Sequence, residues 1–317
     1  MKPFKTHNEQ IEILKNRGLI FKNQAEALCI LERENYYNLI NGYKGFFLDK
    51  DSEVERFKDG TTFEDIYALY LFDRELRNLL LKHLLAFETS LKSRIAYRFT
   101  EKYPETHSYL EIKNYSRNSK NVLDLIAKHF NIIKSQGKQD NAVGHYLAKY
   151  EEVPLWVIVN YMSFGHIQYF YTCMKLSERD KVAKDFSQEF KRNYDFDGAK
   201  ISPEMLDSVI KTANYYRNAC AHEDRLYNFK VRKPAKSSAI SKTLEIENEL
   251  VSDGKIFSMI SFLKLVITKK DYLELLESLE RLFCKYELSF ISIIFSNAIS
   301  EMGIPSAFKN LLSKSYS

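Results

Sequence analysis

The chain of 317 residues and 37.3 kDa is long enough for one large or two ordinary domains, so a sizeable core can be buried without disulfides. Hydrophobic residues make up 45% and charged residues 28%, which excludes disorder as the main state. The formal net charge of +5 permits an RNA partner or a membrane-surface partner but requires neither. The four cysteines are far apart and form no CxxC pair, so we expect no metal site and no disulfide framework.

The sequence lacks targeting segments and common enzyme motifs, which excludes several classes of protein. The N-terminus has no apolar stretch of the kind that directs secretion, and the apolar runs at 256–268 and 289–298 are shorter than the roughly 20 residues that span a bilayer. We therefore expect a cytoplasmic protein with no membrane partner. The motifs of nucleotide-binding proteins, zinc proteases and serine hydrolases are also missing, so no cofactor is predicted.

Apolar residues recur at helical spacing along the chain, which predicts an all-α fold. Helices are expected at 7–17 and 23–41, followed by a loop over 48–61 and by a long helix or kinked pair over 62–103. Further helices are expected at 119–136, 141–151, 154–175, 178–191 and 203–223. A connector at 225–244 contains basic residues and no acid, and residues 245–317 predict three or four more amphipathic helices.

The helix at 203–223 contains the candidate functional residues Arg217, Asn218 and His222. Arg217 falls within the apolar stripe of this helix, where a guanidinium needs an acidic partner or an anionic ligand. Glu88 is the candidate partner, because it also lies within the apolar arc of its own helix. Asn218 and His222 are four residues apart and share a more polar face. His can act as acid or base and Arg can hold a phosphate, so the three residues suit metal-independent RNA cleavage through the ribose 2′-OH.

A structural explanation of the same residues stays open at this point. His222 could simply flank the C-terminus of its helix, while Arg217 forms a buried ion pair. A second arginine and histidine at similar spacing, Arg77 and His83, is interpreted as structural, because Arg77 lies four residues after Asp73 on one helix face. His166 is interpreted as a core or capping residue.

The segment 217–228, RNACAHEDRLYN, resembles the motif of HEPN-superfamily ribonucleases, in the form found in the Abi-type abortive-infection proteins AbiD and AbiF. Five other stretches agree with that family in order and spacing: LKNRGL, ENYYNLINGY, FEDIYALYLFDRELRNLLL, FETSLKSRIAY and PLWVIVNYMSFGHIQYFY. Two features depart from it. Asn38 stands where the family often has a basic residue, and the extension at 245–317 has no counterpart among the shared motifs.

The resemblance implies a HEPN-like helical bundle with N-terminal helices at 1–60, a core at 61–230, and a basic connector with a C-terminal helical extension at 231–317. It also implies an antiphage, toxin-like RNA endonuclease that needs no metal and leaves 2′,3′-cyclic phosphate ends. By position, Arg217, Asn218 and His222 match the catalytic motif. Glu88 and Lys92 match the supporting pair on the companion helix.

The resemblance further implies a homodimer, in which two such motifs face one cleft. It also implies RNA as a partner, as substrate and, as in some members of the family, also as a structured noncoding RNA. No DNA partner is expected. Candidate RNA-binding residues lie in the basic connector at 225–244: Arg225, Lys230, Arg232, Lys233 and Lys236. Two alternatives remain at this stage. The protein could form a ribonucleoprotein with weak or gated nuclease activity, or it could be a helical scaffold for protein partners. For the connector alone, a solvated linker without RNA contact is the alternative.

Overall fold

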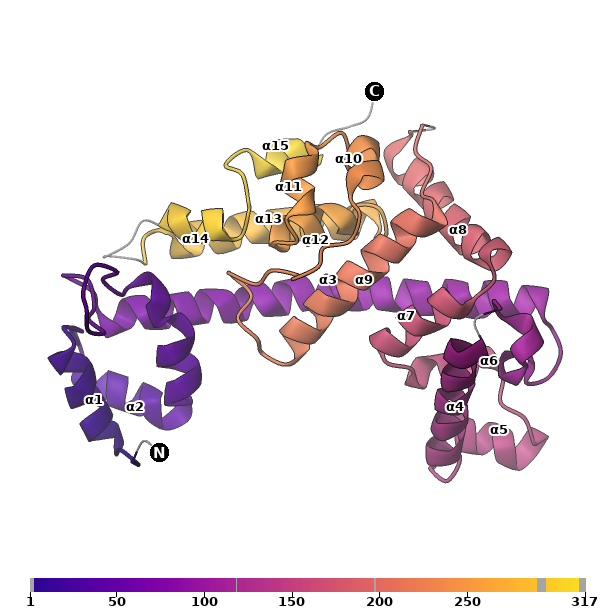
Figure 1. Ribbon diagram of the computed structural model, residues 1–317, viewed down its shortest axis with the longest axis horizontal. Coiled ribbons are helices and arrows are strands. Elements are labelled where there is room, and N and C mark those ends of the chain that lie inside the picture. Colours follow the sequence, from indigo (N-terminus) through magenta and orange to yellow (C-terminus); the bar gives the residue numbers. More distant parts are fainter. Residues whose placement is uncertain (1–2, 118, 197, 290–294, 314–317) are drawn as a thin grey trace.

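A computed structural model describes residues 3–117, 119–196, 198–289 and 295–313. Across these ranges the chain folds into helices joined by loops and a few isolated β-bridges, which confirms the all-α prediction (Figure 1). No helix in these ranges is long and apolar enough to cross a membrane.

The helices follow one another in three groups. The first contains α1 (His7–Asn16), α2 (Gln24–Arg33), the π-helical turn η1 (Tyr37–Asn41) and the 3-10 turn η2 (Lys44–Phe46). The second contains α3 (Phe63–Lys102), η3 (Ser108–Leu110), η4 (Ile112–Asn114), α4 (Ser119–Gln136), α5 (Ala142–Tyr150), α6 (Leu155–Ile158), η5 (Val159–Tyr161), α7 (Phe164–Cys173), α8 (Leu176–Tyr194) and α9 (Pro203–Ala221). The third contains α10 (Ser238–Leu244), α11 (Asn248–Ser252), α12 (Ile256–Leu263), α13 (Lys269–Glu287), α14 (Phe295–Glu301) and α15 (Phe308–Ser313).

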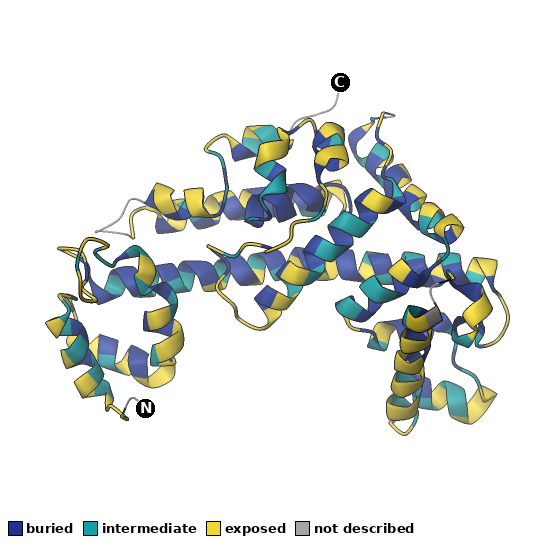
Figure 2. Ribbon diagram, viewed as in Figure 1, coloured by how far each residue is buried: buried dark blue, intermediate teal, exposed yellow. Residues whose placement is uncertain are grey.

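Helix α3 is the central element of the molecule. It begins with a capping box in which Thr62 accepts from the backbone N–H of Asp65 while the Asp65 carboxylate accepts from that of Thr62. It then runs for 40 residues without a break and passes along the whole molecule, with α1 and α2 at one end and α4 to α6 at the other (Figure 1). Helices α7, α8, α9 and α13 all pack against it, so it is buried on several sides (Figure 2).

Aromatic packing fixes the neighbours of α3. Phe72 contacts Phe283, Tyr286 and Phe295 of the C-terminal helices, with ring centroids 5.2 to 6.2 Å apart. Farther along, Phe87 packs edge-on against Phe164 and Phe186, which belong to α7 and α8. The C-terminal helices therefore share the core of α3. The division into segments at 1–60, 61–230 and 231–317 stays a prediction.

Three predicted elements differ from the structure. The helix expected at 154–175 is broken, because Met162 and Ser163 are extended and the Ser163 side chain caps a new helix by accepting from the His166 N–H. The helix expected at 23–41 ends at Arg33, and the chain turns again only where the Asn35 side chain accepts from the N–H groups that follow it. Within the described ranges, residues 245–317 form five helices instead of three or four.

Candidate functional site

Helix α9 positions the residues predicted from the sequence. Its start is the one expected from the sequence, with the Ser202 side chain accepting from the Met205 N–H at 3.2 Å and Pro203 in the first turn. It ends at His222, whose N–H donates to the Asn218 carbonyl at 2.9 Å. His222 thus occupies the C-terminal cap of the helix, and both His222 and Asn218 are exposed.

Arg217 forms the ion pair expected from its position. Its Nε donates to Glu88 Oε2 at 3.3 Å, and Lys92 Nζ lies 2.8 Å from Glu88 Oε1. The pairing of Arg217 with Glu88 is therefore confirmed. The Arg217 side chain is 27% exposed and Glu88 only 7% exposed. No described residue accepts a hydrogen bond from the two terminal nitrogens of Arg217, so this half of the guanidinium can bind a ligand.

His222 lies apart from this ion pair. No hydrogen bond joins its side chain to those of Arg217 or Asn218 in the described part of the chain, and the Asn218 amide instead donates to Asn214 Oδ1 at 3.4 Å. His222 lines a pocket of about 300 Å³ between η1 and the turn after α9, together with Tyr37, Asn38, Asn41, Arg77 and Arg225. The structure brings Arg217, Glu88 and Lys92 together, while His222 faces a pocket that the N-terminal segment helps to form.

A buried network beneath this pocket was not recognised as part of the site from the sequence. The Asp73 carboxylate accepts from the N–H groups of Leu226 and Tyr227 at 2.6 to 3.1 Å, and from the Tyr43 hydroxyl at 2.7 Å. Arg77 Nη1 donates to Asp73 at 2.6 Å and to Tyr43 at 3.0 Å. The i,i+4 ion pair of Asp73 and Arg77 is confirmed.

This network, which we call the latch (Tyr43, Asp73 and Arg77), fixes the turn that carries His222. Burial raises the pKa of Tyr43 and keeps its hydroxyl protonated as a donor. Burial also raises the pKa of Asp73, while the hydrogen bonds from Leu226 and Tyr43 act in the opposite direction. Asp73 and Arg77 both lie on the buried face of α3, and that position was the signal in the sequence that could have identified them.

Arg225 extends the latch toward the N-terminal segment. Its Nη1 donates to the Gly42 carbonyl at 2.6 Å, so the turn after α9 is also tied to the chain next to η1. This contact uses part of the guanidinium that the sequence assigned to RNA binding. Arg225 therefore contributes to the shape of the His222 pocket, whose wall it also lines.

The four basic residues that follow form an ordered surface. Lys230, Arg232, Lys233 and Lys236 are exposed, and no described residue pairs with them. Between them Val231 is buried, and its N–H donates to the Gly254 carbonyl at 2.9 Å. Gly254 has a φ of +74°, and an added Cβ would lie 2.9 Å from Pro234, so a larger residue would disturb this contact. We call these four residues the basic connector surface.

No group of three or more His, Cys, Asp or Glu side chains in the described ranges could hold a metal ion. The comparisons with known proteins point to one family. A family model described as Abi-like protein matches residues 29–228, which include α3, α9, the latch and the motif at 217–228. No curated protein and no solved structure matches the chain.

Proposed function

Because the chain belongs to the Abi-like protein family and so has an abortive-infection-type function, we propose that it acts by cleaving RNA without a metal ion. The observation that supports this most is the state of Arg217. Glu88 holds its Nε, and the two terminal nitrogens remain open, which is the arrangement that binds two oxygens of a phosphodiester.

The proposed reaction is a transfer within the RNA backbone. The ribose 2′-OH loses its proton to a base and attacks the adjacent phosphorus, and the bond to the 5′-oxygen of the next nucleotide breaks. That oxygen takes a proton from an acid, so the products carry a 2′,3′-cyclic phosphate and a 5′-OH. Arg217 stabilises the charge that develops on the phosphate oxygens. His222 is the proton carrier, because it is exposed and lies on the same helix face as Asn218.

One base and one acid are needed at the same time, and each chain supplies one His222. A homodimer in which two α9 C-termini face each other would supply both, one neutral and one protonated. In this arrangement the latch sets the position of each His222 through the following turn. Glu88 and Lys92 orient Arg217.

The test is to incubate wild-type protein and His222→Ala with total RNA in EDTA and to map the ends of the fragments. Wild type should produce 2′,3′-cyclic phosphate ends and His222→Ala should produce none. His145→Ala is the matched control, because His145 is also exposed but lies in α5. Equal cleavage by wild type and His222→Ala would reject the proposal.

A second candidate function rests on the basic connector surface. Four exposed cations on a chain segment anchored by Val231 and Gly254 suit the backbone of a structured noncoding RNA, with which the protein would form a ribonucleoprotein. Neutralising Lys230, Arg232 and Lys233 together should reduce the salt dependence of RNA affinity by a slope of about 2 on a log-log plot. An unchanged slope would favour a solvated connector.

A further inference from the structure

A groove of about 800 Å³ lies between one face of α3 and the α6–η5 segment. Residues of α3 spaced by three and four positions form one wall, among them Lys92, Ser93 and Tyr97. Trp156 and Asn160 form part of the other wall. The groove shares no lining residue with the His222 pocket.

Two aromatic rings stand open at this groove. The Trp156 side chain is 55% exposed and that of Tyr97 is 62% exposed, although burying such rings is normally favourable. Trp156 is the single tryptophan of the chain, and its ring contacts no other ring or cation in the described residues. Both rings can therefore stack on a flat ligand.

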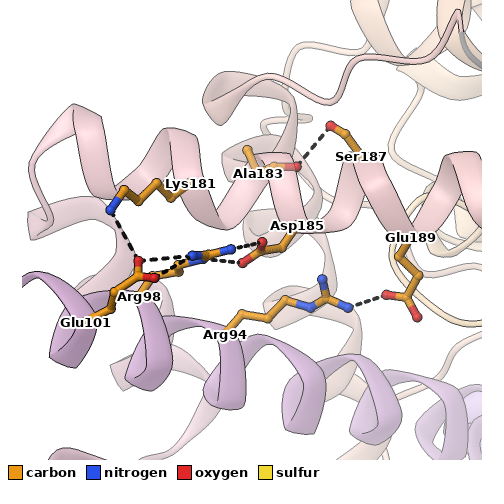
Figure 3. A network of polar contacts seen from close by, with 8 residues as sticks. All are labelled: Arg94, Arg98, Glu101, Lys181, Ala183, Asp185, Ser187 and Glu189. Carbon is orange, nitrogen blue, oxygen red and sulfur yellow. Dashed lines mark hydrogen bonds and ion pairs between the residues drawn. The ribbon is translucent and has the colours of Figure 1, made fainter.

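The ring of Tyr97 lies next to a cation that is itself held by carboxylates. The Arg98 guanidinium lies 5.1 Å from its ring centroid. Arg98 is itself fixed by Asp185 at 2.8 and 2.5 Å and by both oxygens of Glu101 at 3.0 Å, as Figure 3 shows. The α3 wall is thus ordered before any ligand binds.

The side chains that line the two walls of the groove favour one class of ligand over others. Lys92 is paired with Glu88, and Glu101 is paired with Arg98 and Lys181, so each charged group that lines the groove already has a partner. The hydroxyls of Thr89, Ser93 and Thr100 are uncharged groups that bond to no described side chain. Stacking rings beside uncharged donors and acceptors suit a nucleobase with its ribose better than a phosphate or a charged peptide.

The position of Lys92 connects this groove to the candidate catalytic residues. Lys92 lines the groove and pairs with Glu88, which in turn pairs with Arg217. We propose that the groove is a subsite for an unpaired base of single-stranded RNA, stacked on Trp156 and Tyr97, next to the phosphate that Arg217 would hold. This subsite rests on the proposed function for its role in cleavage, but its occupation by RNA can be measured separately.

The single tryptophan provides the test. We would titrate the full-length protein with a single-stranded 2′-O-methyl oligonucleotide of mixed sequence, which cannot be cleaved through its 2′ position, and record Trp156 emission together with the anisotropy of the labelled RNA. Emission should fall as the RNA binds. Tyr97→Ala should raise the Kd about tenfold. Phe130→Ala, which removes a ring of 54% exposure from α4, should leave the Kd within about twofold.

Three outcomes would overturn the subsite. The first is RNA binding by anisotropy with unchanged Trp156 emission, and the second is no binding at all. The third is a Trp156 emission that changes with the concentration of the wild-type protein in the absence of RNA, together with a dimer that dissociates in Trp156→Ala. These two results would assign the groove to a second copy of the chain. Cleavage of total RNA without a change of emission would reject only the subsite, whereas a change of emission without cleavage would reject only the nuclease.

Discussion

Two arginine–carboxylate sites on helix α3 use the same chemistry in different ways. Asp73 and Glu88 are 15 residues apart by their sequence positions, which places the two sites about 22 Å apart along the helix axis. Asp73 and Arg77 are 0% and 5% exposed, and both bond to each other, to Tyr43 and to the turn after α9. Arg217 is 27% exposed and keeps its terminal nitrogens open beside Glu88. The exposure of the guanidinium, and not the ion pair, distinguishes the candidate binding site from the structural one.

The two sites act on the same helix. Glu88 holds α9 through Arg217, and Asp73 holds the turn after α9 through the N–H groups of Leu226 and Tyr227. His222 lies between these two points of attachment. The comparison therefore predicts that damage to the Asp73 site lowers stability, and that damage to the Arg217 site lowers activity.

The largest expected effect is that of Asp73→Ala. It leaves Arg77 buried without its carboxylate and removes the acceptor of two backbone N–H groups, so the free energy of unfolding should fall by about 4 kcal/mol. Urea unfolding measures this change. Asp124→Ala, which removes an exposed acid from α4, should change it by less than about 0.5 kcal/mol. A loss below about 1 kcal/mol in Asp73→Ala would show that the latch does not hold the turn.

The next effect is that of Arg217→Lys on cleavage. Lysine keeps the charge but cannot hold Glu88 and two phosphate oxygens at once, so the cleavage rate should fall about 100-fold while the Tm stays nearly constant. The matched change at the other site, Arg77→Lys, should lower the Tm. If both variants lose stability to the same extent, the distinction between the two sites is wrong.

Glu88→Ala should have a smaller effect on stability than Asp73→Ala. Arg217 is partly exposed and can be hydrated when its partner is removed, so we expect a loss of about 1 to 2 kcal/mol. Cleavage should also fall, because Arg217 would no longer be oriented. A loss as large as that of Asp73→Ala would mean that Arg217 is as enclosed as Arg77.

The last effect concerns a third buried polar pair, which sets the pH range of these measurements. The rings of His129 and His166 stack 5.0 Å apart. Burial lowers their pKa values to about 3 and about 4, and the charges of Lys128 and Lys92 lower that of His166 further. Below pH 6.5 the unfolded chain binds protons that the folded chain does not, so stability should fall as the pH drops from 7 to 5.

Thermal unfolding over this pH range tests the assignment. Replacing both histidines by glutamine should flatten the pH dependence of the Tm, because neither side chain would then take up a proton on unfolding. An unchanged slope in the double variant would show that other groups cause the dependence.

Much of the fold could be predicted from the sequence because local signals agree with the tertiary structure. The capping box at Thr62 and the Ser202–Pro203 start define α3 and α9 correctly. The break at Met162 and Ser163 was missed, since apolar spacing continues across it and only the Ser163 cap marks the new helix. The short C-terminal helices were undercounted for the same reason.

The candidate site could be predicted in part. A charged residue on an apolar helix face predicts the Glu88–Arg217 pair. The spacing of Asp73 and Arg77 predicts an i,i+4 ion pair but gives no sign of its contacts with Tyr43 and the turn after α9. The contribution of η1 to the His222 pocket depends on a contact between segments more than 180 residues apart, Gly42 with Arg225, which no local pattern records.

The most direct test of the account is to measure activity and stability on the same sample of His222→Ala. His222 is exposed and its side chain bonds to no described residue, so the free energy of unfolding should stay within about 0.5 kcal/mol of wild type. The cleavage rate on a defined RNA should fall at least about 1000-fold. A stable variant that cleaves within about tenfold of wild type would contradict the assignment of His222 as the proton carrier.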